Sequence, residues 1–291
     1  MILPDFILPS RQNQVWDESG LDCRNECLDQ LHFDTYPYEV EYRYNSRGFR
    51  DDEWPNSIEA LKDCIWCFGD SFTVGLGSPV EHTWVNILQH RTGTRCINVS
   101  MDGASNDWMV RKINRVLETL APRQIIVQWS YLHRTEVDNS ALTDEERRLH
   151  TMRDPAVANQ LTNFKNLRSK IDKDSIELVE LIIPGGVPIY SHEQYREKIN
   201  FIAGVDWPNL LDISIDEFDL LDTQIKQEIE NIGILNNVTE YLKNKHLLDA
   251  VTDCILVEQV DFARDSHHYD YLTAGRIVDS IIGRFNNSSS W

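Results

Sequence analysis

The stretch Cys64-Ile65-Trp66-Cys67-Phe68-Gly69-Asp70-Ser71-Phe72-Thr73 passes from a short apolar run into a small polar turn. A short apolar run that ends at a glycine is typical of a buried strand. Ser71 therefore follows the carboxyl end of a predicted strand. In open sheets of parallel strands ligands bind at this end, so the position favours a functional role for Ser71.

Beyond this stretch, short apolar runs alternate with segments of helical periodicity. The expected strands are 64–68, 96–99, 124–129 and 176–183, and the expected helices are 83–90, 106–120, 144–173 and 274–285. The first five elements follow a β-α-β-α-β order, which predicts a parallel sheet with right-handed crossovers. Ser105 is the expected N-cap of the helix over 106–120.

The ends of this pattern define the expected domain organisation. Residues 1–60 are rich in Pro, Asp and Tyr and predict an N-terminal extension packed on the core, with a strand pair in 38–44 and a turn at 45–48. Residues 61–291 form the expected α/β domain, with an insertion around 186–256.

Composition excludes several classes of protein. The chain has 291 residues, of which 41% are hydrophobic and 26% charged, as in ordinary folded proteins. The net charge of −19 repels polyanions, so neither a nucleic acid nor an anionic membrane is an expected partner. The apolar runs are shorter than the roughly 20 residues that cross a bilayer.

The first ten residues have no basic region and contain two prolines, so they do not resemble a secretory signal. If the chain is complete, we expect a cytoplasmic location, or a virion-associated one if the chain is phage-encoded.

Six cysteines are too few for a disulfide scaffold in a chain of this length, and we expect them to be reduced. Cys64 and Cys67 have the spacing of a redox pair, but they lie in a predicted strand and not at a helix N-terminus. Cys23, Cys27 and His32 lack a second ligand pair at zinc-finger spacing. We therefore expect no metal and no organic cofactor.

A serine nucleophile needs a base, and the base needs an orienting acceptor. Asp265-Ser266-His267-His268 supplies both just before the last predicted helix, because Asp265 can reach Nδ1 of His268 across a tight turn. Two alternatives remain open. His267 can be the base, although Arg264 and not an aspartate stands three residues before it, or Asp265, His267 and His268 can bind a metal together with an unidentified ligand.

These segments resemble the SGNH hydrolase superfamily, the GDSL-type esterases and lipases. Residues 68–77 are similar to its first block, residues 97–106 to its second and residues 265–268 to its last. Residues 44–50 are similar to a segment that often precedes the first block in microbial and phage-encoded members. The resemblance covers about half of the chain, and it implies a single three-layer α/β/α domain of the flavodoxin-like type with a central parallel sheet.

The resemblance also implies roles for individual residues. Ser71 would be the nucleophile, His268 the general base and then acid, and Asp265 the group that fixes the imidazole. The backbone N–H groups of Ser71 and Gly103 would bind the oxyanion. We expect Asp70 to be a hydrogen-bond partner of the nucleophile loop.

The third block departs from the family pattern. The family has Gly-x-Asn-Asp there, with the Asn as third oxyanion donor, whereas this chain has Gln128-Trp129-Ser130-Tyr131. Ser130 or Asn106 would have to substitute.

The expected function is hydrolysis of short acyl esters, acetyl esters above all, of a carbohydrate or small molecule through an acyl-serine intermediate. The alternatives are a catalytically impaired binding or structural module, and an acyltransferase that passes the acyl group to a sugar hydroxyl.

Overall fold

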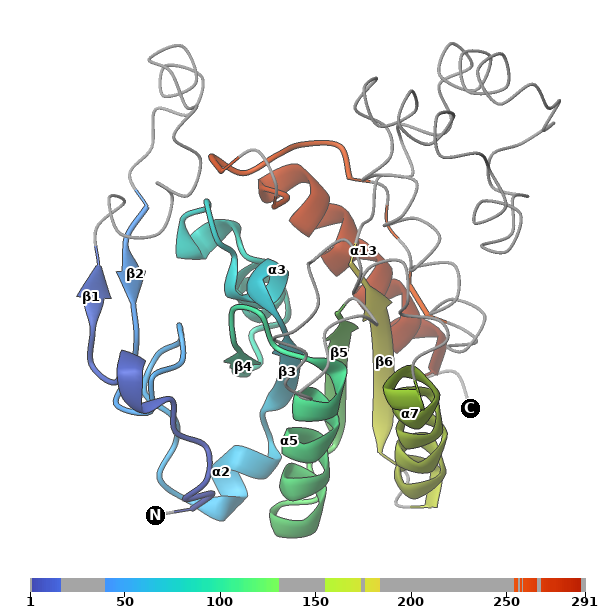
Figure 1. Cartoon of the computed structure of the whole chain (residues 1–291). Helices are drawn as coiled ribbons and strands as arrows, with labels where there is room; N and C mark the ends of the chain where they lie inside the picture. Colours follow the sequence, from blue (N-terminus) through green and yellow to red (C-terminus); the bar gives the residue numbers. More distant parts are fainter. Residues whose placement is uncertain are drawn as a thin grey trace, which may run out of the picture.

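The centre of the molecule is a parallel sheet of four strands in the order β4-β3-β5-β6 (Figure 1). The computed structural model describes residues 2–16, 40–130, 155–173, 176–183, 254, 255, 257, 259–265 and 268–288. The strands are β3 (Ile65–Gly69), β4 (Cys96–Ser100), β5 (Gln124–Trp129) and β6 (Glu177–Ile182). A parallel bridge between Leu181 and Ile255 adds a fifth strand position beside β6, which completes the flavodoxin-like strand order.

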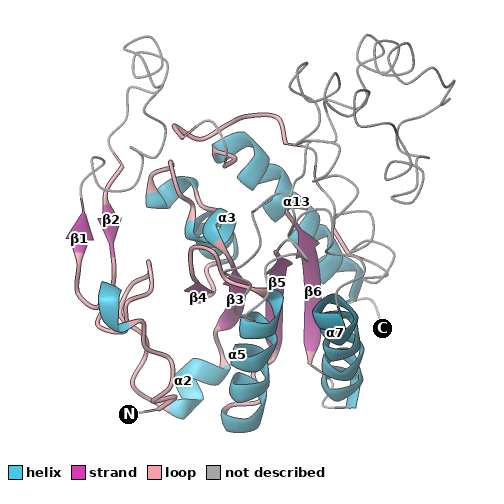
Figure 2. Ribbon diagram, in the orientation of Figure 1, coloured by secondary structure: helices cyan, strands magenta, loops and turns pink. Residues whose placement is uncertain are grey.

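Helices cover both faces of this sheet (Figure 2). They are α4 (Trp84–Thr92), α5 (Asn106–Thr119), α7 (Pro155–Lys173) and α13 (Tyr271–Ser288). Because successive strand residues point to opposite faces, Trp66 and Phe68 of β3 pack in the same cluster as α5 and α7, whereas Ile65 and Cys67 pack with α4 and α13. The three-layer α/β/α fold with a parallel sheet is therefore confirmed.

Local sequence explains where the helices begin and end. The Ser105 hydroxyl accepts the Trp108 N–H at 3.2 Å, which confirms Ser105 as the N-cap of α5. Thr83 caps α4 in the same way, and α4 ends at Gly93, whose left-handed backbone (φ 67°) suits a glycine. Only residues 155–173 of the helix expected over 144–173 are described, and they form α7.

The strand pair expected within 38–44 is wrong in its partner. β2 (Tyr42–Arg43) pairs antiparallel with β1 (Val15–Trp16), while residues 38 and 39 lie outside the described part of the chain. The turn at 45–48 is present, with the Gly48 N–H donating to Asn45 O at 2.9 Å. After this turn Phe49 enters the main core.

The first 60 residues contribute side chains to the core on the α5 side of the sheet. Leu3, Phe6, Phe49 and Trp54 belong to the same buried cluster as Trp66, and the rings of Phe49 and Trp54 stack with their centroids 5.2 Å apart. The segment expected as an insertion, around 186–256, lies almost entirely outside the described residues. Among the described helices, none combines the length and apolar character that a membrane crossing requires.

Candidate active site

Ser71 is the first residue of the short helix α3 (Ser71–Val74), directly after β3. The connection that leaves β3 leads to β4 on one side of the sheet, and the connection that leaves β5 leads to β6 on the other side. In open parallel sheets, ligands bind between two neighbouring strands whose connections diverge in this way. Gly69 is the last residue of β3, and a Cβ there would lie 1.9 Å from Thr73 Oγ1. Close contact between strand and helix thus requires the glycine that precedes Asp70 and Ser71.

Asp70 is fully buried and holds the loop of Ser71 and Phe72 in place. Its Oδ1 accepts the Phe72 N–H at 3.0 Å and caps α3, and its Oδ2 accepts the Ser130 hydroxyl at 2.6 Å. Asp70 therefore joins the ends of β3 and β5. This confirms the expectation that Asp70 is a hydrogen-bond partner of the loop.

The segment before α13 forms the predicted contact between Asp265 and His268. Asp265 Oδ2 lies 2.5 Å from His268 Nδ1, and Asp265 Oδ1 accepts the backbone N–H of His268 at 3.0 Å. The Ala263 N–H donates to His268 O at 2.7 Å, which closes the turn. His267 lies outside the described residues, so its role as an alternative base is untested.

Residues 263–265 and 268, which we call the base turn after the role expected of His268, pack against the loop of Ser71. The Phe72 and His268 rings have centroids 4.4 Å apart, and the Arg264 N–H donates to Gly77 O at 3.0 Å. A Cβ at Gly77 would lie 2.9 Å from Asp265 Cγ. Residues close to Ser71 in the chain are thus in contact with His268 and Asp265, although Ser71 and Asp265 stand 194 positions apart in sequence.

A buried polar network links the same elements beneath this contact. Gln128 Oε1 accepts the Thr73 hydroxyl at 2.9 Å and the Tyr269 hydroxyl at 3.1 Å. Burial raises the pKa of Tyr269 far above its ordinary value, so its hydroxyl stays protonated as a donor. Gln128 therefore stabilises α3 and the start of α13 against β5.

The predicted oxyanion donors have different surroundings. Gly103 has a left-handed backbone (φ 72°), and a Cβ added there would meet no described atom within 4 Å, so space is open beside it. The Met101 N–H donates to Gly69 O at 3.3 Å, which ties this loop to the end of β3.

Ser130 and Asn106 are bonded to other groups. The Ser130 hydroxyl donates to Asp70, Asn106 Nδ2 donates to Ser130 O at 2.9 Å, and Asn106 Oδ1 accepts the Ser130 N–H at 2.8 Å. Asn106 thus connects the end of β5 to α5, and Ser130 connects it to Asp70 in the loop of Ser71.

Two residues before β3 belong to this site although the sequence reasoning assigned them no role. Arg50 and Tyr42 are both buried and contact the loop that follows α3. For Arg50 the signal in the sequence was the similarity of residues 44–50 to a segment that often precedes the first block, whereas Tyr42 lies outside that segment.

A second polar cluster lies next to the base turn. Asp270 Oδ1 accepts the Ser78 hydroxyl at 2.9 Å and lies 2.7 Å from His82 Nδ1. The hydrogen bond to Asp270 raises the pKa of His82, which burial partly opposes. Nothing in the spacing of these three residues indicated that they would meet.

The described thiols do not form a reactive or metal-binding group. Burial raises the pKa of Cys64 to about 11 and that of Cys67 well above its ordinary value, so both are protonated. Within the described ranges no three His, Cys, Asp or Glu side chains are arranged to hold a metal ion.

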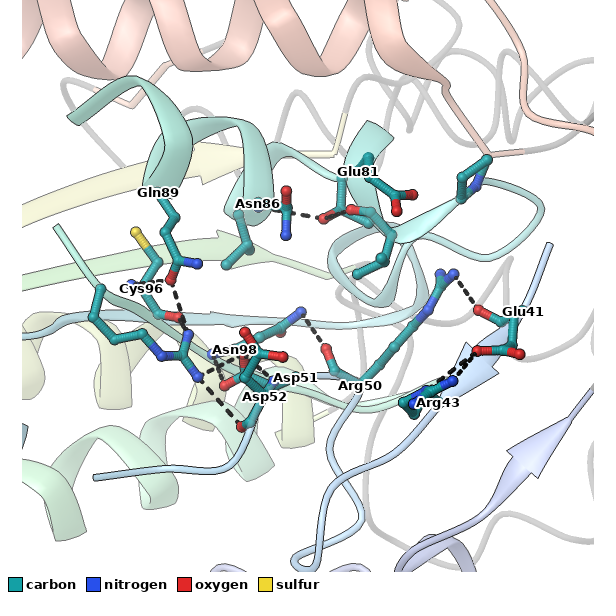
Figure 3. Close-up of a pocket in the computed structure, with 15 residues that line it drawn as sticks. Glu41, Arg43, Arg50, Asp51, Asp52, Glu81, Asn86, Gln89, Cys96 and Asn98 are labelled. Carbon is teal, nitrogen blue, oxygen red and sulfur yellow. Dashed lines mark hydrogen bonds and ion pairs between the residues drawn. The ribbon is translucent and has the colours of Figure 1, made fainter. Parts of the chain in front are cut away.

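A pocket of about 440 Å³, with Arg50 among the residues that line it, lies between the segment 50–52, α4 and β4 (Figure 3). Asp51 lines it and accepts hydrogen bonds from Arg95 at 2.8 Å and from the Asn98 N–H at 3.0 Å. Burial raises the pKa of Asp51 to about 6, against the opposing effect of Arg95. Among the described residues, the lining includes none of the predicted site residues.

No protein-family model and no curated protein matches the chain. Among solved structures, the chain is similar to a GDSL-like lipase from Bacteroides thetaiotaomicron, at 10% identity and a TM-score of 0.38, over 81% of this chain and 93% of the other. It is similar to a lipase/acylhydrolase from Enterococcus faecalis, at 12% identity and a TM-score of 0.36, over 76% of this chain and 95% of the other.

A third similar structure is a carbohydrate esterase family 2 enzyme with a carbohydrate-binding domain from Corynascus thermopiles (Myceliophthora fergusii). The identity is 14% and the TM-score 0.41, over 82% of this chain and 69% of the other. GDSL-type hydrolases, which the sequence motifs resemble, are thus among the solved structures to which this chain is similar.

Proposed function

We propose that the chain is a serine esterase that hydrolyses short acyl esters, acetyl esters above all, of a carbohydrate or another small molecule. The observation that carries the proposal is the 2.5 Å contact between Asp265 Oδ2 and His268 Nδ1, on a turn that packs against the loop of Ser71. A carboxylate on Nδ1 favours the tautomer in which Nε2 is the basic nitrogen.

In the proposed reaction, Ser71 Oγ attacks the ester carbonyl carbon and its proton passes to Nε2 of His268. The ester C–O bond then breaks, the alcohol leaves with that proton, and the acyl group remains on Ser71. Water attacks the acyl carbon and gives a proton to His268, and the carboxylic acid departs as Ser71 Oγ regains the proton. Asp265 orients the imidazole and balances the charge of the imidazolium.

The backbone N–H groups of Ser71 and Gly103 are the proposed oxyanion donors. The open space beside Gly103 supports this role, because a substrate can approach its backbone. Each such donor stabilises the transition state by about 3 kcal/mol. A contribution from Ser130 would require its hydroxyl to exchange Asp70 for the substrate, because a hydroxyl has one hydrogen to donate.

A water-borne substrate with a short acyl group fits the composition of the chain. The net charge of −19 opposes binding to anionic lipid surfaces, and long-chain lipid substrates reside in such surfaces.

The proposal is tested by incubating the purified protein with a fluorophosphonate probe and, in parallel, with p-nitrophenyl acetate. We expect the wild type to be labelled and to release p-nitrophenol, and both signals to vanish in Ser71→Ala and His268→Ala. His90→Ala is the matched control because His90 is exposed on α4, and this variant should behave as the wild type does.

Absence of labelling and of p-nitrophenol release in a folded wild-type protein would overturn the esterase proposal and favour a binding or structural module. Labelling followed by transfer of the acetyl group to an added sugar, without release of acetate, would identify an acyltransferase instead.

A further inference from the structure

The loop Gly75–Ser78, which we call the bridging loop, connects the nucleophile to the base turn. At one end, Ser71 O accepts the Gly75 N–H at 3.0 Å and the Leu76 N–H at 3.3 Å. At the other end, Gly77 O accepts the Arg264 N–H at 3.0 Å, and Gly77 lies directly against Asp265. The position of the bridging loop therefore sets the position of the base turn relative to Ser71.

Arg50 holds the bridging loop from the opposite side. Its guanidinium is buried, and its Nη1 donates to Gly75 O at 2.6 Å and to Val74 O at 3.1 Å. Its Nη2 donates to Ser78 O at 2.9 Å and to Glu41 O at 3.0 Å. One planar cation thus fixes three carbonyl groups at the two ends of the loop, a geometry that the single ammonium of lysine does not reproduce.

Tyr42 fixes the middle of the same loop. Its hydroxyl accepts the Gly77 N–H at 2.8 Å, and its ring lies 4.4 Å from the Arg50 guanidinium carbon. Tyr42 is fully buried in a cluster that also contains Val74 and Leu76. The hydrogen bond and the packing therefore act on the residue that contacts Asp265.

We infer that Arg50 and Tyr42 are positioning residues, which align the base turn of Asp265 and His268 with Ser71 through the bridging loop. The inference rests on the proposed esterase function. It assigns a role in the reaction to two residues of the segment that precedes β3. Neither side chain needs to touch the substrate, so their loss should affect turnover more than substrate binding.

Tyr42→Phe is the sharpest test because it keeps the ring beside Arg50 and removes only the hydroxyl group, which accepts the Gly77 N–H. Tyr44→Phe is the matched control, since Tyr44 is a buried tyrosine of the same segment whose ring lies near Arg11, 5.5 Å from its guanidinium carbon. Both variants are compared with the wild type for kcat and KM on p-nitrophenyl acetate and for the rate of fluorophosphonate labelling. Circular dichroism spectra recorded well below the unfolding temperature verify that each protein is folded.

We expect Tyr42→Phe to lower kcat and the labelling rate by about tenfold, the factor that corresponds to one ordinary hydrogen bond, with KM within about twofold of the wild type. Tyr44→Phe should keep the wild-type kcat and labelling rate. Arg50→Lys provides a second test that keeps the positive charge, and it should lower kcat by at least as much as Tyr42→Phe.

If the wild type is labelled at Ser71 and folded Tyr42→Phe and Arg50→Lys proteins are labelled at the same rate, the positioning role is overturned while the esterase function stands. An equal loss in Tyr42→Phe and Tyr44→Phe would also overturn it, because the effect would then be one of general packing. A wild type that is not labelled would overturn both the esterase function and the positioning role.

Discussion

Replacing Gly77 by alanine tests how closely the base turn depends on the bridging loop. Gly77 has a left-handed backbone with φ 76°, and a Cβ placed on it would lie 2.9 Å from both Asp265 Cγ and Asp265 N. Gly93→Ala is the matched control. Gly93 also has a left-handed backbone, with φ 67°, but a Cβ there would meet no described atom within 4 Å.

One destabilising effect is common to both variants, and a second acts only on Gly77→Ala. An alanine in the left-handed region costs about 1 kcal/mol of unfolding free energy in either variant. At Gly77 the new methyl group would be about 0.6 Å closer to Asp265 than carbon atoms normally approach, and such overpacking costs a further 1–3 kcal/mol, roughly. We therefore expect a loss of about 1 kcal/mol in Gly93→Ala and about 2–4 kcal/mol in Gly77→Ala.

Activity should also differ between the two variants, because the atoms that the new methyl group at position 77 would displace belong to Asp265. A shift of about half an ångström in Asp265 disturbs its 2.5 Å contact with His268, and a misplacement of this size should reduce kcat/KM by about 10- to 100-fold. Urea unfolding followed by the fluorescence of the eight tryptophans gives the stability, and p-nitrophenyl acetate hydrolysis gives kcat/KM. Equal losses of stability and activity in Gly77→Ala and Gly93→Ala would refute the steric coupling between the bridging loop and the base turn.

Three other changes probe the site and its support. Asp265→Asn should lower kcat by about 10³-fold or more with little change in KM, because the amide no longer holds His268 in its productive tautomer. A loss of kcat under about tenfold in steady-state kinetics would contradict this role of Asp265. Glu180→Ala should lower the unfolding free energy by about 3 kcal/mol in urea titrations, since Glu180 is buried and contacts Arg168 through both carboxylate oxygens, at 2.8 and 3.1 Å. A Glu180→Ala loss below about 1 kcal/mol would show that this ion pair is unimportant. His82→Gln should flatten the pH dependence of thermal stability: Asp270 raises the pKa of His82, so the histidine's contribution is complete below about pH 6.5 and is lost as the pH rises through the raised pKa. If the difference in melting temperature between the wild type and His82→Gln stays constant as the pH rises from below about 6.5, the interaction of His82 with Asp270 does not contribute to stability as predicted.

The strands and helices of the sheet domain could be predicted because their local patterns agree with their tertiary environment. β5 runs from Gln124 to Trp129 as predicted, and α5 begins at Asn106 behind the Ser105 cap as predicted. In these segments the period of the apolar residues already matches the face that is buried. Local propensity and long-range packing favour the same structure there.

The N-terminal segment shows the opposite case. Its alternating residues predicted a local strand pair, whereas β2 pairs with β1, where Tyr42 lies opposite Trp16, 26 positions earlier. Further backbone hydrogen bonds join the two segments, since the Tyr44 N–H donates to Gln14 O at 2.9 Å and the Asn13 N–H to Asn45 O at 3.0 Å. A period of two residues identifies a strand without naming its neighbour.

The sequence by itself determined that the chain has a parallel α/β core, that Ser71 follows the carboxyl end of a strand, and that Asp265 stands at the right spacing to contact His268. These are local properties, fixed by apolar period, turn residues and short chain distances. Only the tertiary structure decided that Arg50 and Tyr42 clamp the bridging loop, and that the Ser130 hydroxyl is bonded to Asp70. Such contacts join positions dozens of residues apart, and they depend on how the layers pack, which no local pattern encodes.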